Sequence, residues 1–139
     1  MLENTLKIIL TITTLLLFIS YPIAVFKSYK YVKKNLHSLS NLFFGDPKYY
    51  KKLDWVNHLK IEIAVGAIAA LRFRELKILK RNSVFSKGYL PLSPNLNDKN
   101  LNLLFRDHGK WYKSVTRNIT ISSFCLLIST IIFFILKQN

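Results

Sequence analysis

Two long uncharged runs near the ends of the chain dominate its hydrophobic pattern. Ile8 to Phe26 and Asn118 to Leu136 contain no charged residue and are rich in Leu, Ile, Phe and Thr. As a helix rising ~1.5 Å per residue, each run would cover roughly 28 Å, about the hydrocarbon thickness of a bilayer. Backbone groups in lipid must be bonded within the segment, so we predict transmembrane helices at residues 8–26 and 118–136. The bulky Tyr21-Pro22-Ile23 segment offers no small-residue cleavage site, so we expect the first helix to be retained.

The segment after the first run alternates with a helical period. Its apolar positions step by three and four residues and are Tyr29, Val32, Leu36, Leu39 and Phe43. This pattern predicts that the first transmembrane helix continues as an amphipathic stalk over residues 28–44, ending near Gly45-Asp46-Pro47. We expect the stripe to pack on another helix of the same chain, since amphipathic faces are usually core faces. The alternative is that the stripe lies on the membrane or pairs with a partner.

Two further helices are predicted in the middle of the chain, at residues 59–81 and 101–117. The first is apolar from Ile61 to Leu71 and basic from Arg72 to Arg81. Its apolar half is too short to span and contains Glu62, so we expect a buried or re-entrant helix. Residues 82–100 hold Gly and Pro and predict a loop. The second helix is expected to run into the second transmembrane helix, with Gly109 as a weak point.

Charge sets the expected orientation. The 139-residue chain has 21 Lys and Arg against 7 Asp and Glu, a net charge of +14. Only Lys7 and Lys137 lie outside residues 27–117, so cations flank the inner ends of both apolar runs. By the positive-inside rule, residues 27–117 are cytoplasmic and both termini face the other side. The fold class predicted is an all-α membrane protein with two terminal transmembrane helices and a basic helical cytoplasmic middle.

The cations that flank the two runs are also the expected contacts with anionic lipid headgroups. These residues are Lys27, Lys30, Lys33, Lys34, Lys110, Lys113 and Arg117. A basic and aromatic segment such as Lys48 to Lys52 could bind nucleic acid in principle. Topology and lipid already account for such cations next to two transmembrane helices, so we do not expect nucleic acid as a partner.

The chain offers little that resembles a catalytic or metal site. His37, His58 and His108 match no metal-ligand spacing, and the lone Cys125 lies in an apolar run. No nucleotide-binding or nucleophile motif occurs. We therefore expect surface histidines, no catalytic residue, no metal, no cofactor and no enzymatic activity. The weakest alternative is a membrane enzyme that uses Glu62 or His108.

Two acidic residues stand out from their surroundings. Asp107, next to Arg106 and near Lys110, is expected to be an ion-pair partner. Glu62 stands in an apolar run, and we expect an exposed or headgroup-level carboxylate. The alternative is a buried Glu62 that either has a raised pKa or pairs with a cation, for which Arg72, Lys113 and Arg117 are candidates.

Small and polar residues predict where the two transmembrane helices meet. Helix packing in lipid depends on such residues, because apolar burial contributes little there. Ser122, Cys125 and Ser129 share one face of the second helix, and Thr11 and Thr14 lie three apart in the first. We predict that these faces form a packing seam within one chain or across a dimer. The alternative is that the hydroxyls bond back to carbonyls of their own helices.

The layout resembles that of the universal stress protein B family of small bacterial inner-membrane proteins. The similar residues are Asp46-Pro47 followed by Tyr49 and Tyr50, and the basic, aromatic approach from Asp107 to Arg117. The resemblance implies a protein of the bacterial inner membrane with a general stress role and no known catalytic residues, and with the charge distribution it gives a multi-pass protein whose termini are periplasmic. The alternative function is a small accessory or immunity-type subunit that docks on a larger membrane protein complex.

Overall fold

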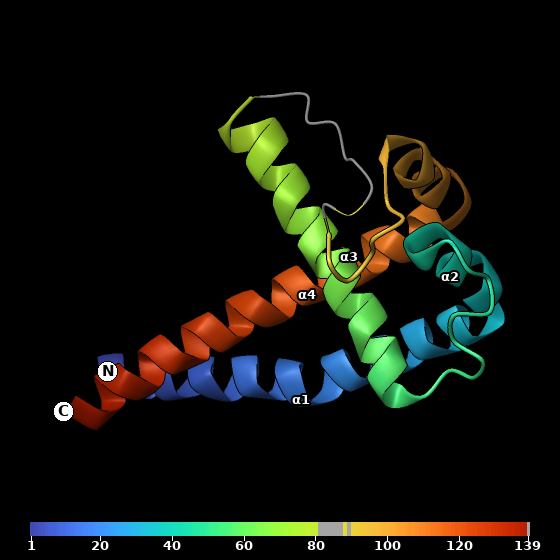
Figure 1. The fold of residues 1–139 in the computed structure, drawn as a ribbon. Helices are drawn as coiled ribbons and strands as arrows, with labels where there is room; N and C mark the ends of the chain where they lie inside the picture. Colours follow the sequence, from blue (N-terminus) through green and yellow to red (C-terminus); the bar gives the residue numbers. More distant parts are fainter. Residues whose placement is uncertain (81–87, 89, 139) are drawn as a thin grey trace. The chain divides into compact units, whose positions relative to one another are not determined.

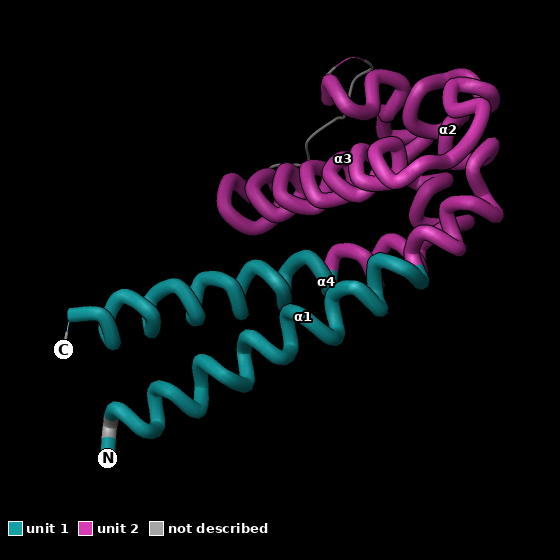
Figure 2. The backbone as a smooth tube through the Cα atoms, turned by 90° about the horizontal axis from the view of Figure 1, so that it is seen from below, with its two compact units in different colours: residues 1–27, 117–139 teal, residues 28–116 magenta. Residues whose placement is uncertain are grey.

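The computed structural model describes residues 1–80, 88 and 90–138, and this part of the chain contains helices and no strand (Figure 1). The helices are α1 (Leu2–Lys34), α2 (Leu36–Phe44), α3 (Trp55–Phe73), the short π-helix η1 (Arg74–Ile78) and α4 (Asp98–Gln138). The predicted all-α class is confirmed. The chain divides into unit 1, residues 1–27 and 117–139, and unit 2, residues 28–116 (Figure 2).

Unit 1 consists of the first part of α1 and the last part of α4. Both helices are long and apolar enough to cross a membrane, with mean hydropathies of 2.3 and 2.5 in their most apolar windows. Only 6% of each window is buried, and large side chains such as Phe18, Ile19 and Phe124 are exposed. A core helix of a soluble protein would bury most of such a window. The predicted apolar helices at the two ends are therefore present, and their outer surfaces are apolar.

The predicted stalk is two helices rather than one. Asn35 has φ −111° and ψ 20°, and this non-helical residue separates the end of α1 from α2. The apolar stripe nevertheless points inward: Val32, Leu39 and Phe43 are fully buried and Leu36 nearly so. The prediction that the stripe packs within the chain is confirmed.

Helix α2 ends as the sequence predicts, at Gly45. This residue has φ 78°, a left-handed conformation that favours glycine. Its N–H donates to the carbonyl of Asn41 at 2.9 Å, and a Cβ here would meet Cγ of Asn95 at 3.1 Å. The turn therefore requires the absence of a side chain both for backbone conformation and for space.

Helix α3 begins four residues earlier than predicted, because Asp54 caps it. The Asp54 carboxylate accepts from the N–H of Asn57 at 2.7 Å, which satisfies a free donor of the first turn. The α-helix ends at Phe73, and η1 continues to Ile78 rather than to residue 81. One face of α3 is buried, including Ile61, Val65 and Ile68. The expectation of a buried helix thus holds for this face only.

Helix α4 is one element from Asp98 to Gln138, which agrees with the prediction that the helix at residues 101–117 runs into the second apolar helix, but it begins three residues earlier than predicted. Asn97 caps its start by accepting from the N–H of Asn100 at 2.9 Å, so the helix begins inside the loop predicted for 82–100. Residues 82–87 and 89 of that loop lie outside the described residues. His108, with φ −124° and ψ 15°, interrupts the helix next to Gly109, the predicted weak point.

Candidate functional site

A cluster of buried polar side chains connects three helices of unit 2. Ser28 of α1, His58 and Glu62 of α3 and Trp111 of α4 are each at most 6% exposed, and we call this set the polar junction. The Ser28 hydroxyl accepts from the indole N–H of Trp111 at 3.1 Å and lies 3.2 Å from Nε2 of His58. Because the hydroxyl can accept and donate, one small side chain bonds groups from two other helices.

The charge state of the polar junction follows from its burial. Loss of water raises the pKa of Glu62, and hydrogen bonding to Ser28 lowers it by less. Loss of water also lowers the pKa of His58. Oε1 of Glu62 lies 3.6 Å from Nε2 of His58, which is longer than a hydrogen bond. Both shifts favour the neutral forms, so we describe the two as a close polar pair rather than a strong ion pair.

These positions correct two expectations from the sequence. Glu62 is buried rather than exposed, and its neighbours are His58 and Ser28 rather than a Lys or Arg. His58 and His108, expected at the surface, are 1% and 5% exposed, whereas His37 is exposed as expected. The i, i+4 spacing of His58 and Glu62 was the signal in the sequence, because it places both side chains on one helix face.

His108 forms a second buried contact, where α4 is interrupted. Its Nδ1 lies 2.9 Å from the hydroxyl of Tyr31 in α1, and its Nε2 lies 2.9 Å from Oγ of Ser38 in α2. The Tyr31 ring also stacks on Trp111 of the polar junction, with ring centroids 5.6 Å apart. Both ring nitrogens of His108 are therefore engaged in holding three helices together. The neighbouring Asp107 is ion-paired with Arg106 at 2.7 Å, as predicted.

All seven cations predicted to contact lipid headgroups are exposed. Four lie on α1 and three on α4: Lys27, Lys30, Lys33, Lys34, Lys110, Lys113 and Arg117. Their exposure is consistent with the expected contacts at the membrane surface.

Among the described residues of unit 1, a side-chain hydrogen bond joins α1 to α4. Oγ1 of Thr13 lies 2.7 Å from Oγ of Ser129, and Thr13 is 8% exposed. Thr11, which we expected in the seam, is exposed and donates to the carbonyl of Lys7 at 2.8 Å. Thr11 and Thr13 are about 200° apart around a helix, so they cannot face the same neighbour. Of the other seam residues, Thr14, Ser122 and Cys125 are half-buried.

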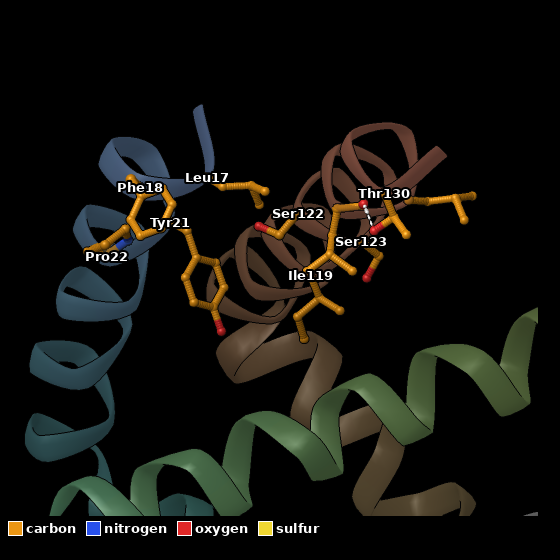
Figure 3. Close-up of a pocket in the computed structure, with 10 residues that line it drawn as sticks. Leu17, Phe18, Tyr21, Pro22, Ile119, Ser122, Ser123 and Thr130 are labelled. Carbon is orange, nitrogen blue, oxygen red and sulfur yellow. Dashed lines mark hydrogen bonds between the residues drawn. The ribbon is translucent and has the colours of Figure 1, made fainter. Parts of the chain in front are cut away.

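An apolar groove lies between the two helices of unit 1, with a volume of about 1060 Å³ (Figure 3). Leu17 and Tyr21 of α1 and Ser122 of α4 point into the space between the helices. The only polar groups in the groove are hydroxyls, and that of Thr130 donates to the carbonyl of Leu126 at 2.8 Å. The groove thus offers an apolar surface, with no carboxylate, imidazole or thiol among its lining residues.

Within the described residues, no three His, Cys, Asp or Glu side chains come together in a way that could hold a metal ion. Cys125 is a free, half-buried thiol in unit 1. No family model matches the chain, and comparison with curated proteins and with solved structures likewise gives no match.

Proposed function

We propose that this chain is a non-enzymatic, multi-pass protein of the bacterial inner membrane that contributes to the general stress response. The observation that carries the membrane location is the pair of apolar helices in unit 1, which expose rather than bury their apolar side chains. A bilayer is the solvent that such surfaces require. The exposed cations of α1 and α4 next to these helices support a cytoplasmic unit 2 in contact with anionic lipids.

The buried groups of unit 2 support a role without catalysis. A general acid or base must come within hydrogen-bond distance of its substrate. His58 and Glu62 are buried against each other and Ser28, and both ring nitrogens of His108 are bonded to other helices. These groups connect helices, and the arrangement favours a folded unit whose surface, rather than an active site, carries its function.

The stress role rests on the resemblance in layout to the universal stress protein B family, since no family model matches. Its test is survival of a deletion strain in stationary phase and after membrane stress. We expect survival to fall and to be restored by the wild-type chain. Unchanged survival under all such conditions would contradict the stress role and leave the membrane location standing.

One surface favours the alternative, an accessory or immunity-type subunit of a larger membrane complex. Opposite its buried face, α3 carries the exposed side chains Val56, Leu59, Ile63 and Phe73. Their spacing places them on one side of the helix, beside the exposed cation Lys60. An apolar stripe bordered by an exposed Lys fits an amphipathic helix of a partner protein with an acidic residue at its edge. A homodimer through this stripe or the unit 1 groove is the other assembly consistent with these surfaces.

Purification in mild detergent tests the alternative. A partner in fixed stoichiometry should be lost on Leu59→Gln with Ile63→Gln, which remove the centre of the stripe. Leu92→Gln, at an exposed apolar residue elsewhere in unit 2, is the matched control and should retain the partner. Equal retention by all three proteins would exclude the stripe as the docking surface.

A further inference from the structure

Beside the interruption of α4, unit 2 has a pocket of about 670 Å³. Its walls are the segment from Phe105 to Lys113, Tyr31 of α1 and Arg72 of α3. The hydrogen bonds from His108 to Tyr31 and Ser38 hold α4 in its interrupted form. The pocket is therefore part of the folded helix junction and not a gap between independent segments.

The charges that line the pocket are unbalanced. Four cations, Arg72, Arg106, Lys110 and Lys113, face one acid, Asp107. That acid is already ion-paired with Arg106 through both carboxylate oxygens, at 2.7 and 3.0 Å. Three cations thus surround the pocket with no acidic group of the lining left for them. Such a surplus favours an anionic ligand.

Arg72 is held in place by an aromatic ring. Its guanidinium carbon lies 4.3 Å from the centroid of the Phe105 ring, and Phe105 packs edge-on against Tyr112. Stacking uses the face of a guanidinium and leaves its N–H groups in the plane able to donate to oxygen anions. The pocket therefore combines a positioned Arg, two flexible Lys and an aromatic wall. A phosphate group attached to an organic body matches this combination.

The chain also indicates where such a phosphate comes from. Lys113 stands four residues before Arg117, and after Arg117 no charged residue occurs until Lys137. Cations just before an apolar membrane-spanning helix lie at the depth of lipid phosphates. We propose that this pocket binds the phosphate of an anionic phospholipid headgroup. The inference rests on the proposed membrane location, and it adds a defined site to the general attraction of the basic segment for lipid.

The test uses the purified full-length chain in mild detergent. Binding of phosphatidylglycerol and of phosphatidylcholine is measured by native mass spectrometry, with and without millimolar inorganic phosphate. We expect phosphatidylglycerol to bind in preference and to resist competition by inorganic phosphate. Arg72→Gln and Lys113→Gln should each weaken phosphatidylglycerol binding by about fivefold, the loss expected for one cation near an anionic surface. Arg72→Lys should be intermediate, because it keeps the charge and loses the planar stack.

Lys51→Gln with Lys52→Gln is the matched control, since it removes two exposed cations that do not line the pocket. It should leave phosphatidylglycerol binding within twofold of wild type. Because Lys113 is exposed, Lys113→Gln should fold even if Arg72→Gln does not, and thermal unfolding checks both. An equal loss in the control pair, no preference over phosphatidylcholine, or displacement by inorganic phosphate would each overturn the proposal. The last result would assign the pocket to a soluble phosphate compound. None of these measurements depends on the stress phenotype.

Discussion

At the scale of single residues, the buried pair His58 and Glu62 shows how burial changes the role of a polar side chain. In the sequence, Glu62 is one acid in an apolar run. In the structure, burial raises the pKa of Glu62 and lowers that of His58, while the Ser28 hydroxyl lies 3.2 Å from Nε2 of His58 and accepts from the indole N–H of Trp111. Buried polar groups cost free energy unless they are bonded, so this network specifies how α1, α3 and α4 meet.

The raised pKa of Glu62 predicts a pH-dependent effect of Glu62→Gln. The carboxyl group of Glu62 binds its proton more readily in the folded protein than in the unfolded chain. Its contribution to the stability of the folded protein is therefore present at low pH. It is lost as pH rises through the folded pKa. The Gln variant has no such loss, and its stability relative to wild type should improve as pH rises above 4.5, the ordinary pKa of a Glu side chain.

The lowered pKa of His58 has the opposite effect on stability, and this effect is present in both the wild type and the Glu62→Gln variant. It removes stability as pH falls below the ordinary value of about 6.5, so it largely cancels in the comparison. Thermal unfolding in detergent at several pH values gives the measurement. Glu3→Gln, at an exposed carboxylate, should show no pH-dependent difference over this range. A constant difference for Glu62→Gln would contradict the neutral, buried pair.

The sequence could predict a side-chain contact only where the two residues are close together in the chain. The ion pair of Arg106 with Asp107 joins neighbours in the chain and was predicted correctly. The burial of His58, Glu62 and His108 depends on Ser28, Tyr31 and Ser38, which come from other helices. The pattern of residues along a single chain does not indicate which helices pack together, so these polar contacts could not be predicted.

At the scale of the helices, capping and helix faces decide where elements begin and how they pack. Asp54 and Asn97 each cap a helix start, and both starts lie outside the boundaries predicted from apolar periodicity. Both residue types are common N-caps, so the signal was present in the sequence. The amphipathic stripe from Tyr29 to Phe43 was predicted from its own spacing, and it is buried from Val32 to Phe43, whereas Tyr29 is half-buried.

The contact between Thr13 and Ser129 predicts that bulk at this face will separate the helices of unit 1. Ser129→Phe should lower the thermal stability of the purified chain, because a large side chain replaces a hydroxyl that lies 2.7 Å from its neighbour. Ser129→Ala should be nearly silent, since an interhelical hydrogen bond in lipid contributes only ~0.6 kcal/mol. Ile131→Phe, at a half-exposed side chain, is the control. Equal tolerance of both Phe variants would exclude this contact face.

Substitution by Ala is expected to have opposite effects on stability at two glycines. Gly45→Ala should destabilise unit 2 by ~1 kcal/mol or more, since φ is 78° and the new Cβ would lie 3.1 Å from Cγ of Asn95. Gly109 has nothing within 4 Å of a Cβ and no positive φ. Gly109→Ala should therefore be neutral or stabilising by up to ~1 kcal/mol. Chemical unfolding followed by circular dichroism compares them, and destabilisation by Gly109→Ala would show that the interruption at His108 requires glycine.

At the scale of the whole molecule, the distribution of apolar and charged residues along the sequence distinguishes the two units before any contact is known. The uncharged runs at residues 8–26 and 118–136 predicted the apolar helices of unit 1, and the cations between them mark unit 2. Both runs were expected to continue as helix into the segment between them, and α1 and α4 do extend beyond the runs, although α1 ends at Lys34 rather than near residue 44. Hydropathy reports the apolar portion of a helix, and both helices continue into polar sequence as far as Lys34 and back to Asp98.

The orientation in the membrane is the claim on which the proposed location, lipid contacts and headgroup pocket all depend. Fusion of a reporter that is active only in the periplasm tests it directly. The account predicts activity for a fusion after Asn139 and silence for a fusion after Asn97, the residue before α4. A cytoplasm-active reporter at the same two positions should give the complementary pattern. Activity of the periplasmic reporter after Asn97 together with silence after Asn139 would contradict the account.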